Sequence, residues 1–172
     1  MRVVVTLFLA LLLSACGAAD KAFLGFWQVQ GERFEYLKIE RNGEGHLLTS
    51  YSNSFWDGSL KREEFPVSIQ ENSLTTGIPG FGGVYKEADK TLVFNGKKVF
   101  VKVDEAEALK VITAREQEEA KAAADCKLLQ EEVDRKHEQL QGASKEEWNA
   151  YVKTLRDRLP KRCRLKNAGM AW

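Results

Sequence analysis

The chain has few of the residues that build most metal and catalytic sites: two histidines and three cysteines among 172 residues. A metal site needs more such ligands than the chain offers, so we expect no metal and no cofactor. The formal net charge of +1 gives no general attraction to nucleic acid. No Gly-x-Ser-x-Gly motif is present, and His46 and His137 fall in a predicted strand and on a predicted helical stripe. The sequence therefore predicts no catalytic residues and a protein that is not an enzyme.

Apolar runs of membrane-spanning length are also missing. The N-terminal run Val3 to Leu13 is too short, because a bilayer needs about 20 apolar residues. Its length, after the positive Arg2, is typical of a signal peptide. The run ends in Leu13-Ser14-Ala15-Cys16, where two small residues precede a cysteine.

These four residues resemble the lipobox of bacterial lipoproteins. The resemblance implies a signal peptide over residues 1–15, cleavage before Cys16, and lipid on the Cys16 sulfur. A lipidated tether would then cover residues 16–22. Gly17 resembles the outer-membrane class, so the implied place is the cell envelope, with the protein lipid-anchored in the outer membrane and facing the periplasm. The alternative is an ordinary secretory signal with a chance cysteine.

Export would place the chain in an oxidising compartment, where disulfides persist. With Cys16 lipidated, Cys126 and Cys163 are the two remaining thiols. Residues 105–140 are rich in helix formers and carry an apolar stripe, and a second stripe spans residues 148–159. If the chain folds back near residues 142–144, one antiparallel register opposes both stripes and places the two cysteines together. The sequence therefore predicts a structural disulfide, which would contribute about 4 kcal/mol.

The aromatic-rich region between the N-terminal tether and the two helical segments carries short strand-like runs. The candidates are residues 26–30, 34–41, 46–51, 66–70, 83–85, 91–94 and 97–103. The strongest hairpin has Asn95-Gly96 at its turn, a pair that favours the type I′ turn. Short strands with close turns predict an antiparallel meander, either a small barrel or a strongly curved sheet, with about five to seven strands.

Gly25-Phe26-Trp27 resembles the Gly-x-Trp sequence that opens the first strand of lipocalin-like barrels. Trp27 is expected to be a core residue that closes the base of the barrel, with a ligand contact as the alternative. The predicted fold class is α+β: a small antiparallel β-meander or barrel-like module over residues 23–104, then an antiparallel helical hairpin over residues 105–165 and a tail over residues 166–172.

Two aromatic segments are candidates for contact with a partner. Phe55 and Trp56 lie among small polar residues, and exposed aromatic side chains favour interfaces. A strand end packed into the barrel is the alternative there. Phe81 lies in the glycine-rich segment 77–83, which lacks the Gly-Lys-Ser/Thr of a phosphate-binding loop. Its side chain is expected either to contact a partner or to enter the mouth of the barrel.

A third candidate is the basic C-terminal segment, which includes Arg158, Arg162 and Arg164. It would suit an acidic protein, anionic lipid headgroups or a cell-wall polymer, whereas the alternative is a solvated basic helix end.

The function expected from these features is a binding or interaction module tethered in the envelope, such as an inhibitor or immunity lipoprotein. Its partners would be the bilayer and a protein or envelope component, with no nucleic acid. One alternative is a lipocalin-like carrier of a small apolar ligand, which requires an apolar cavity of roughly 300 Å³. Another is a structural accessory of an envelope assembly, with the hairpin as its docking arm.

Overall fold

The computed structural model describes residues 16–140 and 145–166. The predicted signal peptide, residues 1–15, lies outside the described residues, as does segment 167–172 of the expected tail. The Cys16 side chain is likewise not described, although the backbone of Cys16 begins helix α2 (Cys16–Phe23). The expected tether is therefore helical in its backbone. The chain divides into two units, with the boundary between Ile112 and Thr113.

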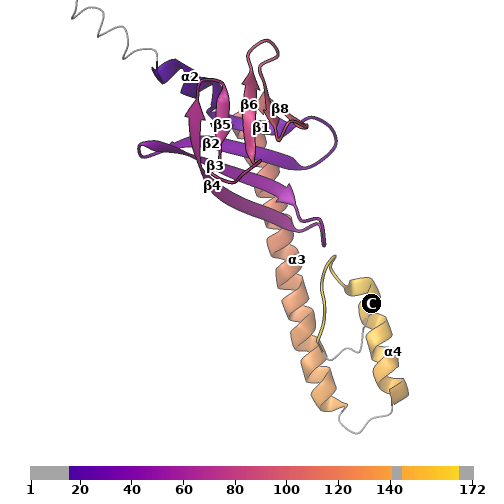
Figure 1. Ribbon diagram of the computed structural model, residues 1–172. Helices are drawn as coiled ribbons and strands as arrows, with labels where there is room; N and C mark the ends of the chain where they lie inside the picture. Colours follow the sequence, from indigo (N-terminus) through magenta and orange to yellow (C-terminus); the bar gives the residue numbers. More distant parts are fainter. Residues whose placement is uncertain (1–15, 141–144, 167–172) are drawn as a thin grey trace, which may run out of the picture. The chain divides into compact units, whose positions relative to one another are not determined.

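Eight antiparallel strands form a closed barrel in which each strand pairs with its neighbours in sequence (Figure 1). The strands are β1 (Gly25–Val29), β2 (Glu35–Asn42), β3 (Gly45–Asn53), β4 (Leu60–Gln70), β5 (Ser73–Thr75), β6 (Gly82–Lys86), β7 (Thr91–Phe94) and β8 (Lys98–Val103). The antiparallel barrel is confirmed, but the expected number of five to seven strands is wrong. The shortfall arises at β5, which has three residues, because so short a run carries no readable alternation.

The Asn-Gly turn predicted between β7 and β8 is confirmed. Asn95 and Gly96 both have positive φ angles, 51° and 66°. The Lys97 N–H donates to the Phe94 carbonyl at 3.1 Å and closes the turn. Two consecutive left-handed residues match the twist of the flanking strands, which is why this pair specifies a tight hairpin.

Aromatic and aliphatic side chains fill the barrel, and α2 packs against one end of this core. Phe23 and Trp27 are fully buried, which confirms the expectation that Trp27 is a core residue. The Trp27 indole N–H donates to the Phe23 carbonyl at 2.7 Å. The Lys102 amine donates to the Ala22 carbonyl at 3.3 Å and lies over the Trp27 ring. Two carbonyls near the end of α2 are thereby satisfied by groups of the barrel.

A second cluster lies on the outer face of the barrel. Phe26, Tyr36 and Tyr51 pack with Ala108 and Ile112, which belong to the first turns of α3 (Glu105–Gln139). These turns cover apolar side chains that would otherwise face water. The barrel unit therefore extends eight residues beyond the expected boundary at residue 104.

The second unit contains the rest of α3, the short helix α4 (Lys145–Leu155) and a 3₁₀ turn, η1 (Arg156–Arg158). Its buried core is small, with Leu129, Val133 and Leu155 at the centre. Cys126 and Cys163 form the predicted disulfide, with their Cα atoms 5.4 Å apart. Helix α4 ends at Leu155, before the predicted end of the second stripe at residue 159.

Candidate functional site

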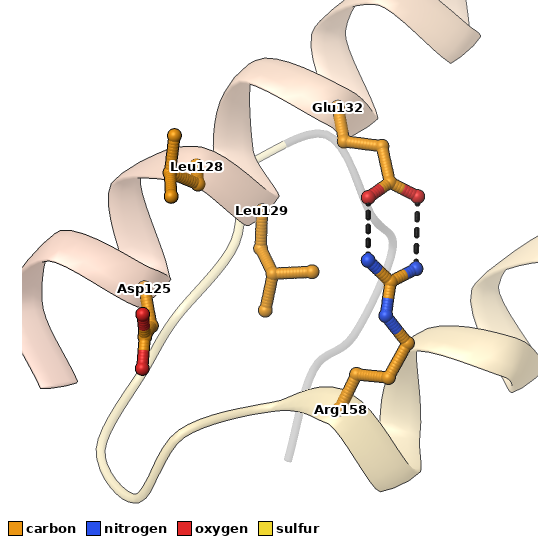
Figure 2. Close-up of a pocket in the computed structure, with 5 residues that line it drawn as sticks. All are labelled: Asp125, Leu128, Leu129, Glu132 and Arg158. Carbon is orange, nitrogen blue, oxygen red and sulfur yellow. Dashed lines mark hydrogen bonds and ion pairs between the residues drawn. The ribbon is translucent and has the colours of Figure 1, made fainter.

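The basic C-terminal segment is largely engaged within the chain. Both guanidinium Nη atoms of Arg158 donate to the Glu132 carboxylate, at 2.9 and 2.7 Å (Figure 2). Arg162 forms an ion pair with Glu119. Arg164 is exposed. Arg158 and Arg162, which the sequence offered as partner contacts, thus hold the C-terminal segment against α3.

Figure 2 also shows the pocket beside this ion pair, a shallow space of about 250 Å³ lined by Asp125, Leu128, Leu129, Glu132 and Arg158. Hydrogen bonding from Arg158 holds the pKa of Glu132 below its usual range. Glu132 also accepts a 3.3 Å hydrogen bond from the Tyr151 hydroxyl. A carboxylate with both oxygens engaged and a lowered pKa is a poor general base, and Glu132 serves here as the ion-pair partner of Arg158.

The loop between β3 and β4 presents the two most exposed aromatic side chains in the described part of the chain. Phe55 is 91% exposed and Trp56 is 92% exposed. Their rings touch edge to face, with centroids 5.5 Å apart. The alternative of a strand end packed into the barrel is therefore wrong for these two residues.

Hydrogen bonds hold the backbone of this loop in one shape. The Ser54 N–H donates to the Ser59 carbonyl at 2.7 Å, and the Gly58 N–H donates to the Ser54 carbonyl at 2.8 Å. Asp57 Oδ1 accepts from the Ser59 N–H and hydroxyl, at 3.0 and 2.7 Å. Gly58 has a φ of 66°, which a glycine adopts at no steric cost. The aromatic pair is thus displayed on an ordered turn, and ordering it on binding costs little entropy.

A pocket of about 560 Å³ adjoins this loop. Its lining residues are Glu32, Arg33, Phe34, Glu35, Ser52, Asn53, Phe55 and Lys98. Glu35 and Lys98 form an ion pair at 2.5 Å. Neither residue stands out in the sequence, because β2 and β8 are far apart along the chain and only the closure of the barrel brings them together. The mixed lining suits polar or peptide groups better than a wholly apolar ligand.

Phe81 caps the interior rather than projecting from it. Its ring lies 5.2 Å from the centroids of both Phe65 and Phe94. Its carbonyl accepts a hydrogen bond from the Thr76 hydroxyl at 2.6 Å. The aromatic contacts continue inward from Phe94 to the fully buried Phe100. Of the two alternatives for Phe81, the structure shows entry into the mouth of the barrel.

Chain direction places these features relative to α2. Helix α2 precedes β1, and neighbouring strands are antiparallel. The loops that follow β1, β3, β5 and β7 therefore lie at the barrel end away from α2. Phe55, Trp56 and the half-exposed Ile78 belong to two of these loops. The aromatic pair and its neighbouring pocket are therefore displayed at the end opposite the α2 helix.

His46 lies at the start of β3, beside α2, and His137 lies in the second unit. His46 Nε2 is buried, lies 3.6 Å from Asp20 Oδ2 and has no hydrogen-bond partner among the described residues. His137 contacts the Trp148 ring edge to face at 5.4 Å. Within residues 16–140 and 145–166, no group of three or more histidine, cysteine, aspartate or glutamate side chains could hold a metal ion. None of the helices among these described residues is both long enough and apolar enough to cross a membrane.

Comparisons of the chain with protein-family models, with curated proteins and with solved structures find no match.

Proposed function

We propose that the chain is a lipid-anchored binding protein of the bacterial cell envelope, with no chemistry of its own. The lipobox-like Leu13-Ser14-Ala15-Cys16 supports the anchor, because acyl chains on Cys16 would partition into a bilayer. The partner is a protein or envelope component, and the inhibitor or immunity type is one concrete form of this role.

The observation that carries the binding role is the exposure of Phe55 and Trp56 on an ordered loop. Phe55 and Trp56 are 91% and 92% exposed, so a partner that covers them removes a large apolar surface from water, which favours binding. Aromatic residues are enriched among the side chains that dominate interface energetics. Their place at the end away from α2 directs them away from the anchor that Cys16 would provide.

A carrier role for a small apolar ligand has less support. Phe23, Trp27, Phe100 and their neighbours fill the barrel interior, and the pocket near Phe55 has charged residues in its lining. An accessory role would use the second unit, with the expected hairpin of α3 and α4 as its docking arm. The pairing of Arg158 with Glu132 favours a structural use of that hairpin's basic end.

The anchor is tested by metabolic labelling with an alkyne fatty acid, followed by membrane fractionation. The wild-type chain should carry the label and sediment with membranes, and Cys16→Ser should lose both properties. Cys163→Ser is the matched control, because it removes a cysteine without touching the lipobox. Labelling that persists in Cys16→Ser contradicts the anchor.

The binding role is tested by placing a photoreactive phenylalanine analogue at position 55 in cells that express the full chain. We expect a discrete crosslinked product that disappears when Trp56→Ala is combined with the analogue. The same analogue at position 128 is the control, because Leu128 is 63% exposed but lies in the other unit. Equal products at both positions, or none at position 55, contradict a binding role for the loop.

A further inference from the structure

One edge of β4 is open over more than half of the strand. On one side β4 pairs with β3 from Leu60 to Val67. On the other side its pairs with β5 cover Ser68 to Gln70 only. Within the described residues, the first part of the longest strand of the barrel therefore has a strand neighbour on one side alone.

Strand geometry shows which backbone groups this edge presents. Gln70 and Ser73 are the closing pair of a two-residue turn, so Gln70 directs its N–H and carbonyl towards β5. Directions alternate along a strand, and hence Leu60, Glu64 and Pro66 direct their backbone groups to the open edge. Proline lacks an N–H, and it is tolerated within a strand at such an edge. The position of Pro66 agrees with an edge that has no partner within its own barrel.

The side chains beside this edge carry a short alternating charge pattern. Arg62 and Glu64 lie on one face of β4 and form an ion pair at 2.6 Å. Lys61 and Glu63 lie on the other face and form an ion pair at 2.8 Å. The four side chains are between 43% and 57% exposed. Such charges discourage pairing with an arbitrary apolar strand.

We propose that this edge pairs with β4 of a second copy of the chain, in antiparallel orientation, and so forms a symmetric dimer. Residues that face one another across an antiparallel pair must both direct their backbone groups to the shared edge. The register that uses the longest open stretch places Leu60 opposite Pro66 of the second copy. It also places Arg62 opposite Glu64 of the second copy.

Charge complementarity favours this occupant over another strand. The two-fold axis repeats the Arg62–Glu64 match, so opposite charges meet twice on one face. Glu63 meets Glu63 of the second copy at the axis, and Lys61 of each copy lies diagonally beside that pair. The pairing stops near Ser68 because β5 occupies the edge from that residue onward. The inference does not depend on the lipid anchor or on the aromatic loop.

Charge reversal gives a test that separates the dimer from effects within one chain. Arg62→Glu places two glutamates against each other in both symmetric pairs, and Glu64→Arg places two arginines there. Each single variant should raise the dimer dissociation constant roughly tenfold or more, as measured by sedimentation of the full chain in density-matched detergent. When the two variants are mixed, a heterodimer should form, because glutamates at 62 and 64 then face arginines at 64 and 62.

The single charge reversals Lys38→Glu and Glu40→Lys are the matched controls, since Lys38 and Glu40 form an in-strand ion pair at 2.5 Å on β2, which pairs with β1 and β3. Each should leave dimerisation unchanged. Circular dichroism confirms that each variant is folded, and the double variant Arg62→Glu with Glu64→Arg should dimerise like the wild type. A wild-type chain that stays monomeric up to about 1 mM overturns the proposal. So does a mixture of folded single variants that forms no heterodimer.

Discussion

Replacing Cys126 and Cys163 with alanine removes the covalent link of the second unit. The bonded residues lie 37 positions apart in sequence, so the change returns the freedom of a long loop to the unfolded chain. The chain-entropy relation gives a loss of about 4 kcal/mol for a loop of this length. Leu129, Val133 and Leu155 each contribute about 1.5–3 kcal/mol through burial, so the loss equals the burial of about two of them.

Hydrogen exchange followed by mass spectrometry measures this loss locally. A decrease of about 4 kcal/mol corresponds to about a thousandfold rise in the opening equilibrium. We therefore expect amides near Val133 in α3 and throughout α4 to exchange up to about a thousandfold faster in the double-alanine variant. Amides around Leu48 in the barrel should keep their wild-type rates and serve as the internal control.

Unchanged protection of α4 in the double-alanine variant would refute the reasoning. In that case the ion pair between Arg158 and Glu132, with the hydrogen bonds between Gln130 and Lys166, would hold the segment without the bond. Wild-type protein kept in reducing agent should behave like the variant. A difference between the two would assign the effect to the alanine side chains rather than to the link.

Three further predictions concern packing and protonation. Gly83→Ala should lower the free energy of unfolding, measured by urea titration, by about 1–3 kcal/mol, because a Cβ atom there would lie 2.9 Å from two buried side chains. Gly45→Ala is the control and should change that free energy little, because a Cβ atom at Gly45 would have its nearest neighbour at 3.9 Å. Trp27→Phe should cost about 1–3 kcal/mol and speed amide exchange in α2, because the buried Phe23 carbonyl loses its donor; unchanged exchange would contradict this. The folded pKa of Glu132 lies below the unfolded value of about 4.3, so its contribution is present above that pH and is lost as pH falls through the folded pKa. Glu132→Gln should therefore flatten the acid loss of stability seen by circular dichroism, and an identical pH profile would count against the pairing.

The helical part could be predicted closely because its signals are local. Helix periodicity fixes which residues share a face, and a tight connection leaves few antiparallel registers. The pairing of Cys126 with Cys163 followed from that register, and the structure contains the bond. The end of α4 was placed too late, because a 3₁₀ turn at Arg156–Arg158 continues the apolar spacing without continuing the α-helix.

The barrel could be predicted only in outline. The first half of β4 was missed, since Lys61 to Glu64 are four charged residues in succession, and they form a strand because β3 offers a complete row of hydrogen-bond partners. Gly82 was not among the predicted strand residues, whereas Gly83 was, and together they begin β6. A Cβ atom at Gly82 would lie 2.6 Å from the Leu74 carbonyl oxygen, so the close approach of β5 requires glycine there.

At the candidate site, too, the sequence identified the residues and the tertiary structure decided their environments. Sequence singled out Phe55, Trp56 and Phe81 by residue type, and it gave two possible environments for each segment. Closure of the barrel then left the first two exposed and packed Phe81 against Phe65 and Phe94. The arginines at 158 and 162 were identified as a basic cluster, but their acidic partners lie on another helix.

The sequence by itself determined the features that depend on neighbours along the chain: the helical stripes, the cysteine pairing, the Asn-Gly turn and the antiparallel order of short strands. Tertiary structure alone decided the number of strands, the filled interior, the open edge of β4 and the exposure of the aromatic loop. These depend on residues brought together from distant positions, because a side chain's burial is set by the strands that close around it rather than by its own type.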